Sequence, residues 1–157
     1  MSQGQPRPTR FWAAFFPAFY RLIRVGEPLL RRWLRRCPLG DTVELTVVGR
    51  RSGRPRRVLL GLLTAGGAWY VGHPAGASDW TRNLDAAATA TVRRPGHEAV
   101  TVRAILLADG PERERAIRAT FRQHPFPGNV IYRLARGHVR AAGRFYRLKP
   151  LEEPVAS

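Results

Sequence analysis

Short extended segments joined by tight turns fill the chain beyond residue 41, and they restrict the possible folds more than any other feature. Val43, Leu45 and Val47 alternate with polar residues, as in a strand with one buried face. Gly66-Gly67 separates two apolar runs and predicts a hairpin turn. The segments expected as strands are residues 43–47, 57–64, 68–72, 89–93, 98–107 and 143–148. Because hairpins link most of them, we expect an antiparallel sheet closed as a barrel, with helices packed outside it.

Helical patterns surround the predicted sheet. In the segment 28–37, apolar residues at helical spacing alternate with arginines, which predicts an amphipathic helix with a strongly basic face. The segments expected as helices are residues 9–23, 28–37, 79–85, 111–124 and 129–136. The fold class is therefore α+β. We expect a tail and amphipathic helices over 1–40, one barrel domain over 41–150 and a tail over 151–157.

Positive charge dominates the composition. The chain has 27 Lys and Arg residues against 11 Asp and Glu residues, a formal net charge of +16. A field of this sign attracts anionic small molecules, nucleic acid or anionic lipid. A nucleic-acid or anionic-surface module is therefore one interpretation, but no helix-turn-helix, basic zipper or aromatic strand platform supports it.

Cysteine and histidine usage favours neither disulfides nor metal. Cys37 is the single cysteine, which favours a reducing compartment, and we expect a cytoplasmic protein. The four histidines lack the spacing of metal ligands, so no metal is expected. The apolar run 11–20 is too short to cross a bilayer, and Pro17 interrupts it, so a secretory signal is not predicted.

The connector Gly49-Arg50-Arg51-Ser52-Gly53-Arg54-Pro55-Arg56 is the most informative motif. Its two glycines let the backbone turn and expose N–H groups, and its arginines offer planar forks that bind phosphate or carboxylate. The alternative is a solvated hairpin tip. The sequence has no Rossmann fingerprint, no phosphate-binding P-loop and no nucleophile elbow. A cofactor-borne reaction is favoured over hydrolysis, because it demands fewer protein groups.

Two motifs carry a resemblance to a known family. The stretch from Val47 to Leu60 resembles the signature of the deazaflavin (F420)-dependent nitroreductases, and Trp80-Thr81-Arg82-Asn83-Leu84 resembles their Trp-x-x-Asn-Leu segment. The resemblance extends over about residues 41–150. It implies a split β-barrel related to flavin-binding oxidoreductases, and coenzyme F420, an 8-hydroxy-5-deazaflavin with a phosphodiester and an oligoglutamate tail. It also implies hydride transfer from the deazaflavin C5 to a quinone-like or nitroaromatic acceptor.

The resemblance also implies the residues that contact the cofactor. They are Gly49, Arg50, Arg51, Ser52, Gly53, Arg56, Val58, Leu59, His73, Pro74, Ala75, Gly76, Trp80 and Asn83, with Arg54 and Arg57 as lesser candidates. The segment 72–76 departs from the family's usual Ala-Ser-Lys-Gly-Gly. FMN, a tetrapyrrole or a lipid is therefore kept as an alternative ligand. Trp80 and Asn83 have structural alternatives too, as a core aromatic and a local hydrogen-bonding group.

Catalytic and substrate-contacting residues are expected among the few remaining polar and aromatic candidates. The Tyr132 hydroxyl is suited to hydrogen-bond a substrate oxygen or to donate a proton, and His73 is a second proton source. A structural role is the alternative for both. The expected substrate pocket consists of Phe15, Phe19, Phe126 and Tyr132.

The aromatic N-terminal stretch has three interpretations. It packs on the barrel, covers a substrate pocket, or lies on the anionic inner face of the cell membrane. The expected partners are a small-molecule hydride acceptor, with no specific nucleic acid, and a second copy of the chain in a homodimer.

Overall fold

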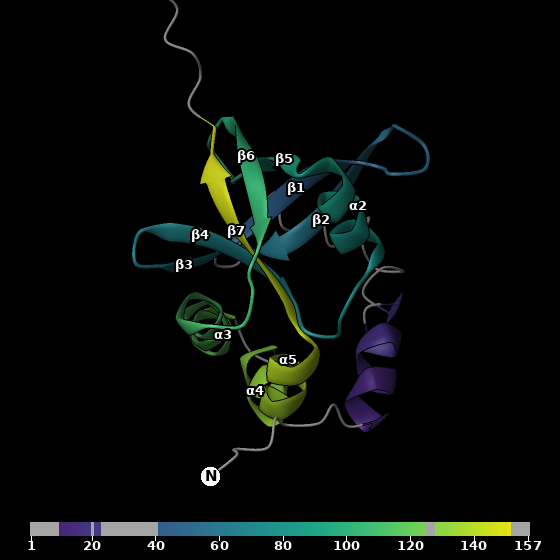
Figure 1. The fold of residues 1–157 in the computed structure, drawn as a ribbon, viewed down its shortest axis with the longest axis vertical. Helices are drawn as coiled ribbons and strands as arrows, with labels where there is room; N and C mark the ends of the chain where they lie inside the picture. The colour runs from purple at the N-terminus through teal and green to yellow at the C-terminus, as the bar shows by residue number, and fades with distance from the viewer. Residues whose placement is uncertain (1–9, 20, 23–40, 125–127, 152–157) are drawn as a thin grey trace, which may run out of the picture.

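The computed structural model describes residues 10–19, 21–22, 41–124 and 128–151. Seven strands among these residues form one antiparallel sheet in the order β2-β1-β5-β6-β7-β4-β3. The strands are β1 (Thr42–Val48), β2 (Pro55–Gly61), β3 (Leu63–Ala65), β4 (Ala68–His73), β5 (Thr89–Arg93), β6 (Ala99–Leu106) and β7 (Arg144–Pro150). Figure 1 shows the sheet strongly curled, and the predicted antiparallel sheet is confirmed.

Helices cover the curled sheet on two sides. They are α2 (Asp79–Ala87), α3 (Pro111–Gln123), α4 (Gly128–Leu134) and α5 (Arg136–Ala142), together with an N-terminal helical segment over 10–19 and 21–22. One apolar cluster lies inside the curl, where Leu84 of α2 joins inward residues of the strands such as Leu45. A second cluster lies between α3, α5, the N-terminal segment and β3–β4, around Ile117 and Phe16. Burial of these two faces is the main force that holds the layers together.

Several local predictions are confirmed. The burial of β1 alternates as expected, and the hairpin glycines Gly66 and Gly67 have φ of +57° and +75°. These values suit the turn that joins twisted antiparallel strands. The helices α2 and α3 begin at Asp79 and Pro111, as expected, and the structure shows Ser78 as the cap of α2.

The strand predicted over 57–64 is wrong, because the chain forms two strands there. β2 ends at Gly61, the N–H of Leu62 donates to the carbonyl of Asp41 over 2.8 Å, and β3 then pairs with β4. The apolar run thus crosses a corner of the sheet. Composition cannot reveal such a corner, since both halves remain apolar.

The helix predicted over 129–136 is also wrong in extent. α4 ends at Leu134, and the separate helix α5 follows with only His138 and Val139 buried. Two buried residues give no helical periodicity, so the sequence pattern missed this element. The predicted helix 28–37 and Cys37 lie outside the described residues. None of the described helices has the length and apolar character needed to span a bilayer.

Candidate functional site

The connector between β1 and β2 is a closed backbone turn. The N–H of Gly49 donates to Arg54 O over 2.9 Å, and the N–H of Gly53 donates to Gly49 O over 2.8 Å. A Cβ at position 49 would lie 2.8 Å from Ser52 Oγ, and Gly53 has φ of +63°. Both positions therefore favour glycine, as the motif predicted. Figure 1 shows this turn projecting at the upper right of the molecule.

Most arginines of the connector are open to solvent. Arg51, Arg54 and Arg56 are exposed, and none of them forms an ion pair with an acidic side chain among the described residues. Ser52 is exposed too, and its Oγ accepts the N–H of Arg54 over 3.3 Å. Arg57 is exposed with Glu44 at 3.9 Å. The turn thus presents several guanidinium groups with little compensating negative charge.

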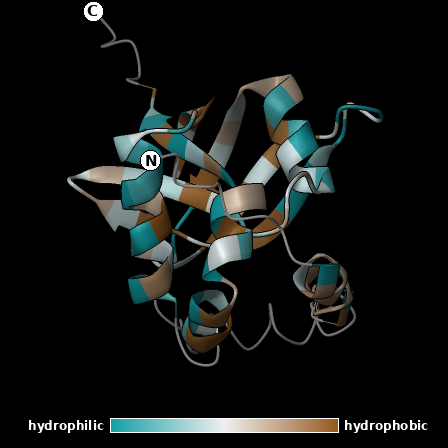
Figure 2. Cartoon of the chain, turned by 60° about the horizontal axis from the view of Figure 1, so that its bottom comes forward, coloured by the Kyte–Doolittle hydropathy of each residue, from teal (hydrophilic) through white to brown (hydrophobic). Residues whose placement is uncertain are grey.

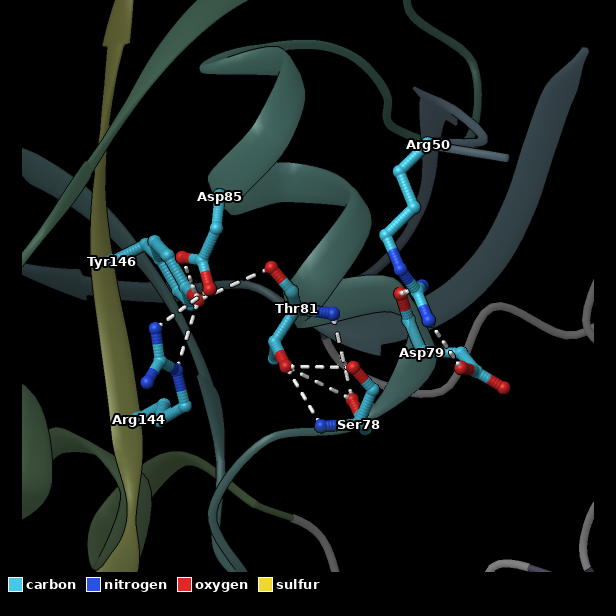
Figure 3. A network of polar contacts seen from close by, with 7 residues as sticks. All are labelled: Arg50, Ser78, Asp79, Thr81, Asp85, Arg144 and Tyr146. Atoms are coloured by element: carbon cyan, nitrogen blue, oxygen red, sulfur yellow. Dashed lines mark hydrogen bonds and ion pairs between the residues drawn. The ribbon is translucent and has the colours of Figure 1, made fainter. Parts of the chain in front are cut away.

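Arg50 behaves differently, because it joins the connector to α2. Its Nη1 donates to Asn83 Oδ1 over 2.9 Å, and its backbone N–H donates to the same oxygen over 3.2 Å. Its Nη2 lies 3.4 Å from Asp79 Oδ1 (Figure 3). The structure therefore brings the two sequence motifs into direct contact across 33 residues of chain.

A second set of polar contacts fixes α2 against β7. Tyr146 donates its hydroxyl to Asp85 Oδ1 over 2.7 Å, and Arg144 Nη2 donates to Asp85 Oδ2 over 2.7 Å (Figure 3). Burial raises the pKa of Tyr146 to about 12, although its hydrogen bond with Arg144 opposes that shift. The phenol therefore stays protonated and donates. Sequence reasoning missed these residues, because no motif links positions about sixty apart.

The helix start itself is also fixed. Ser78 and Thr81 form a reciprocal capping box, in which each side chain accepts the other residue's backbone N–H. Such caps stabilise a helix end by about 1 kcal/mol. The orientation of Trp80 and Asn83 is thus set from both ends of the helix.

His73 and Trp80 meet at the end of β4. Their ring centroids are 6.1 Å apart in an edge-on arrangement, and His73 Nδ1 accepts the N–H of Ala75 over 3.3 Å. Burial lowers the pKa of His73 to about 4, against a hydrogen bond with the Gly76 backbone that raises it. The imidazole is neutral at pH 7. It cannot then supply the proton of an imidazolium.

Pro74 and Tyr132 line one small cavity of about 10 Å³ beneath the sheet. The His124 ring lies 4.5 Å from the Tyr132 ring, and His124 Nδ1 is 3.0 Å from the carbonyl of Thr120. This volume has room for about one water molecule and not for a tricyclic ring. Figure 1 places α4, which carries Tyr132, at the opposite end of the molecule from the connector.

The predicted aromatic pocket is only partly described. Phe15 and Phe19 are half-buried and stack with centroids 5.6 Å apart, while Phe16 beside them is fully buried. Figure 2 shows this helical segment largely in the hydrophobic colour, and the connector in the hydrophilic one. Phe126 lies outside the described residues.

Comparison with known proteins decides the family. The model of the F420H(2)-dependent quinone reductase family matches residues 31–130. The chain belongs to this family. The resemblance of the two motifs to deazaflavin-dependent reductases is thereby confirmed, and the family's cofactor is F420. No curated protein sequence matches the chain.

Solved structures share the fold at low identity. An F420-H2 dependent reductase, FDR-A, is 21% identical with a TM-score of 0.53, over 69% of this chain and 94% of its own. HutZ, the heme storage protein of Vibrio cholerae, is 15% identical with a TM-score of 0.53, over 81% of this chain and 91% of its own. A protein solved as a domain-swapped dimer is 19% identical with a TM-score of 0.52, over 82% of this chain and 99% of its own. The split-barrel fold predicted from the sequence is confirmed.

The connector fits the anionic part of the family's cofactor. Exposed guanidinium groups on a glycine-closed turn bind phosphate and carboxylate oxygens in pairs. β2 is an edge strand, so half of its backbone N–H and C=O groups have no partner strand among the described residues. The register with β1 directs the backbone groups of Val58 toward Leu45, so Leu59 is the residue of this pair whose N–H and C=O lie on the free edge beside the arginines.

Proposed function

We propose that this protein transfers a hydride from reduced F420 to a quinone-like or nitroaromatic acceptor. When bound, the deazaflavin supplies the hydride from its C5 position. The family match supports the proposal, and one observation of the chain carries it: exposed Arg51, Arg54 and Arg56 on a closed turn, without acidic partners among the described residues. A ligand with several negative charges is what such a surface attracts.

The proposed roles divide along β2. The side chains of Arg51, Ser52, Arg54, Arg56 and Arg57 hold the phosphate and carboxylates. The backbone of Leu59 on the free edge of β2 hydrogen-bonds the planar part, and Val58 lines it. The segment 73–76 and Trp80 complete the binding surface. Neutral His73 orients groups by hydrogen bonding and does not act as an acid at pH 7.

Tyr132 is the proposed proton donor to the reduced acceptor. Its ring packs between Phe16 and His124 at centroid distances of 6.0 and 4.5 Å, so its position is well defined. Replacement by Phe should lower kcat by roughly 10²-fold with quinone, while F420 affinity stays unchanged. Rapid mixing of the variant with reduced F420 and a soluble quinone measures this. An unchanged kcat would mean that solvent, and not Tyr132, donates the proton to the reduced acceptor.

Ligand titration tests the proposed binding site. We would titrate the protein with F420, with the tail-less 8-hydroxy-5-deazariboflavin, and with FMN and haem, and follow fluorescence or absorbance. Arg51→Ala and Arg56→Ala should each weaken F420 by about tenfold, the value of one charge-assisted hydrogen bond. They should leave the tail-less ring unaffected. Arg122→Ala, an exposed arginine on α3, is the matched control. Preferred binding of haem or FMN would reject the deazaflavin assignment.

The N-terminal helix is proposed to contact an anionic membrane surface, where lipid-soluble quinones are found. Phe11 and Leu22 are 65% and 73% exposed, and arginines at 10 and 21 lie beside them. Phe11→Ser should reduce co-sedimentation with anionic vesicles and leave F420 affinity unchanged. Equal sedimentation of the variant and the unchanged protein removes this part of the proposal.

A homodimer is the proposed assembly. Ile105 and Leu106 of β6 are 44% and 47% exposed on a sheet, and large apolar groups at such positions favour pairing of subunits. Light scattering at several protein concentrations measures the mass. A mass of one chain at all concentrations excludes the dimer.

A further inference from the structure

Arg50 stands apart from its neighbours on the connector, because its cationic group is already bound within the protein. Its side chain is 23% exposed and contacts Asp79 and Asn83, whereas the guanidinium groups of Arg51, Arg54 and Arg56 have no acidic partner among the described residues. Its Nη1 donates both to Asn83 Oδ1 at 2.9 Å and to the carbonyl of Asp79 at 3.4 Å. A guanidinium held in this way has fewer donors to offer to a ligand.

Asn83 is used in a complementary way. Its Oδ1 accepts both the backbone N–H and the guanidinium of Arg50, and the residue is only 8% exposed. An amide oxygen has two lone pairs, so these two bonds satisfy it. The oxygen that the Trp-x-x-Asn-Leu motif contributes is therefore directed to the connector.

This contact reaches the backbone of the turn. The Arg50 N–H that Asn83 holds follows directly after Gly49, whose N–H and carbonyl both take part in closing the turn. Fixing the peptide between residues 49 and 50 fixes the direction in which Arg51 leaves the backbone. α2 is itself fixed by its capping box and by Asp85, so it is a rigid support.

We propose that Arg50 is a positioning residue: with Asn83 it locks the connector onto α2, so that the exposed arginines are preorganised for an anionic ligand. In this proposal Arg50 does not contact the ligand. The role in ligand binding rests on the proposed function, whereas the lock itself is a property of the free protein. Preorganisation raises affinity because the turn loses less conformational entropy on binding.

A double-mutant cycle with F420 tests the coupling. Asn83→Ala removes both hydrogen bonds to Arg50 and should weaken binding by about tenfold, whereas Arg50→Ala keeps the backbone N–H bond and should weaken it by less. The effect of the double variant should fall short of the product of the two single effects, since both act on the same lock. Arg122→Ala with Asn83→Ala is the matched pair, and its effect should equal that of Asn83→Ala alone. If the effects of Arg50→Ala and Asn83→Ala multiply, or if Arg50→Ala leaves the affinity unchanged, the proposal is overturned.

Hydrogen exchange of the free protein gives an independent readout. The amides of residues 49, 50 and 53 donate hydrogen bonds at this turn. They should exchange at least about tenfold faster in Asn83→Ala, faster to a smaller extent in Arg50→Ala, and at an unchanged rate in Arg51→Ala. If the exchange rates stay unchanged in all three variants, the proposal that Arg50 and Asn83 lock the connector onto α2 is overturned.

Conservative variants keep the charge and guard against unfolding. Arg50→Lys should behave like Arg50→Ala, since an ammonium lacks the planar fork whose two nitrogens contact Asn83 and Asp79 separately, whereas Arg51→Lys should retain most of the affinity. Equal tolerance of lysine at both positions overturns the proposal. Failure of the unchanged protein to bind F420 would reject the proposed function, and the exchange experiment would still decide whether the lock exists.

Discussion

The connector end of the molecule, formed by the connector, β2 and α2, contrasts with the helical end, formed by α3, α4, α5 and the N-terminal helical segment. At the connector end, directional polar contacts join elements far apart in sequence, such as Arg50 with Asn83 and Tyr146 with Asp85. At the helical end, apolar packing around Ile117, Phe16 and Phe145 dominates. His124 and His138 lie there too, and burial lowers the pKa of each.

This contrast shows that folding stability and ligand-binding specificity arise in different parts of the molecule. Apolar packing contributes most of the folding free energy, and it tolerates small shifts of geometry. Charged hydrogen bonds contribute less to the folding free energy, but they fix the position and direction of the donor groups, to within about 0.5 Å and 10–20°. We therefore expect mutations at the helical end to act on stability, and mutations at the connector end to act on ligand binding.

The largest effect is expected from a cavity at the helical end. Ile117 is fully buried. Replacement by Ala should lower the free energy of unfolding by about 2–5 kcal/mol, and replacement by Val by about 1 kcal/mol. Urea unfolding measures both. F420 affinity at a temperature where the variant is folded should not change. A weakened affinity would show that the two ends are coupled.

A smaller loss is expected at Asp85. Its replacement by Ala leaves the buried Tyr146 hydroxyl without its 2.7 Å acceptor and should cost about 1–3 kcal/mol. Asp109→Ala is the control, since this exposed carboxylate lies 3.5 Å from Arg113. Its loss should lower the free energy of unfolding by less than about 0.5 kcal/mol. Equal losses in the two variants would contradict a special role for the α2–β7 contact.

The pH dependence of stability tests the buried histidine at the end of β4. The pKa of His73 is lowered to about 4 in the fold, so the unfolded chain takes up a proton first as the pH falls. The contribution of neutral His73 to the free energy of unfolding is fully present above pH 6.5, and it is lost progressively as the pH falls towards 4. His73→Gln should reduce this loss by roughly 1–2 kcal/mol between pH 7.5 and 4.5 in urea unfolding. His97→Gln, at an exposed turn, is the control.

The smallest effect is expected from the ion pair between Arg140 and Glu114. The two charges lie 3.5 Å apart on side chains that are each about 40% exposed. Glu114→Gln should change stability by less than about 0.5 kcal/mol, as for most exposed pairs. Thermal unfolding at low and high salt measures it. A loss above about 1 kcal/mol would mean that ion pairs, and not packing alone, hold the helical end together.

Sequence patterns predicted the local elements well where one periodicity covers a whole element. β1, the Gly66-Gly67 hairpin, α2 and β5 lie where they were expected. The errors occurred at the corner near Leu62 and at α5. Each depends on a partner strand or a buried surface that is distant in the sequence, so local spacing contains no signal for it.

The candidate site divides in the same way. Both motifs were visible in the sequence, since glycine spacing and clustered arginines are local properties. Their contact was not, and neither was the contribution of Arg144 and Tyr146 from β7. The role of Arg50 could not be separated from that of Arg51, because the two residues are chemically identical.

The sequence by itself determined that this chain folds into an antiparallel sheet with a basic, glycine-flanked turn, since strand alternation, turn residues and charge follow from residue order alone. Only the tertiary structure decided which guanidinium groups face solvent. Asn83 lies 33 residues from Arg50 and becomes its partner through the packing of α2 on β1. Whether a guanidinium group can bind a ligand, or is already bound within the protein, depends on the residues that the fold places beside it.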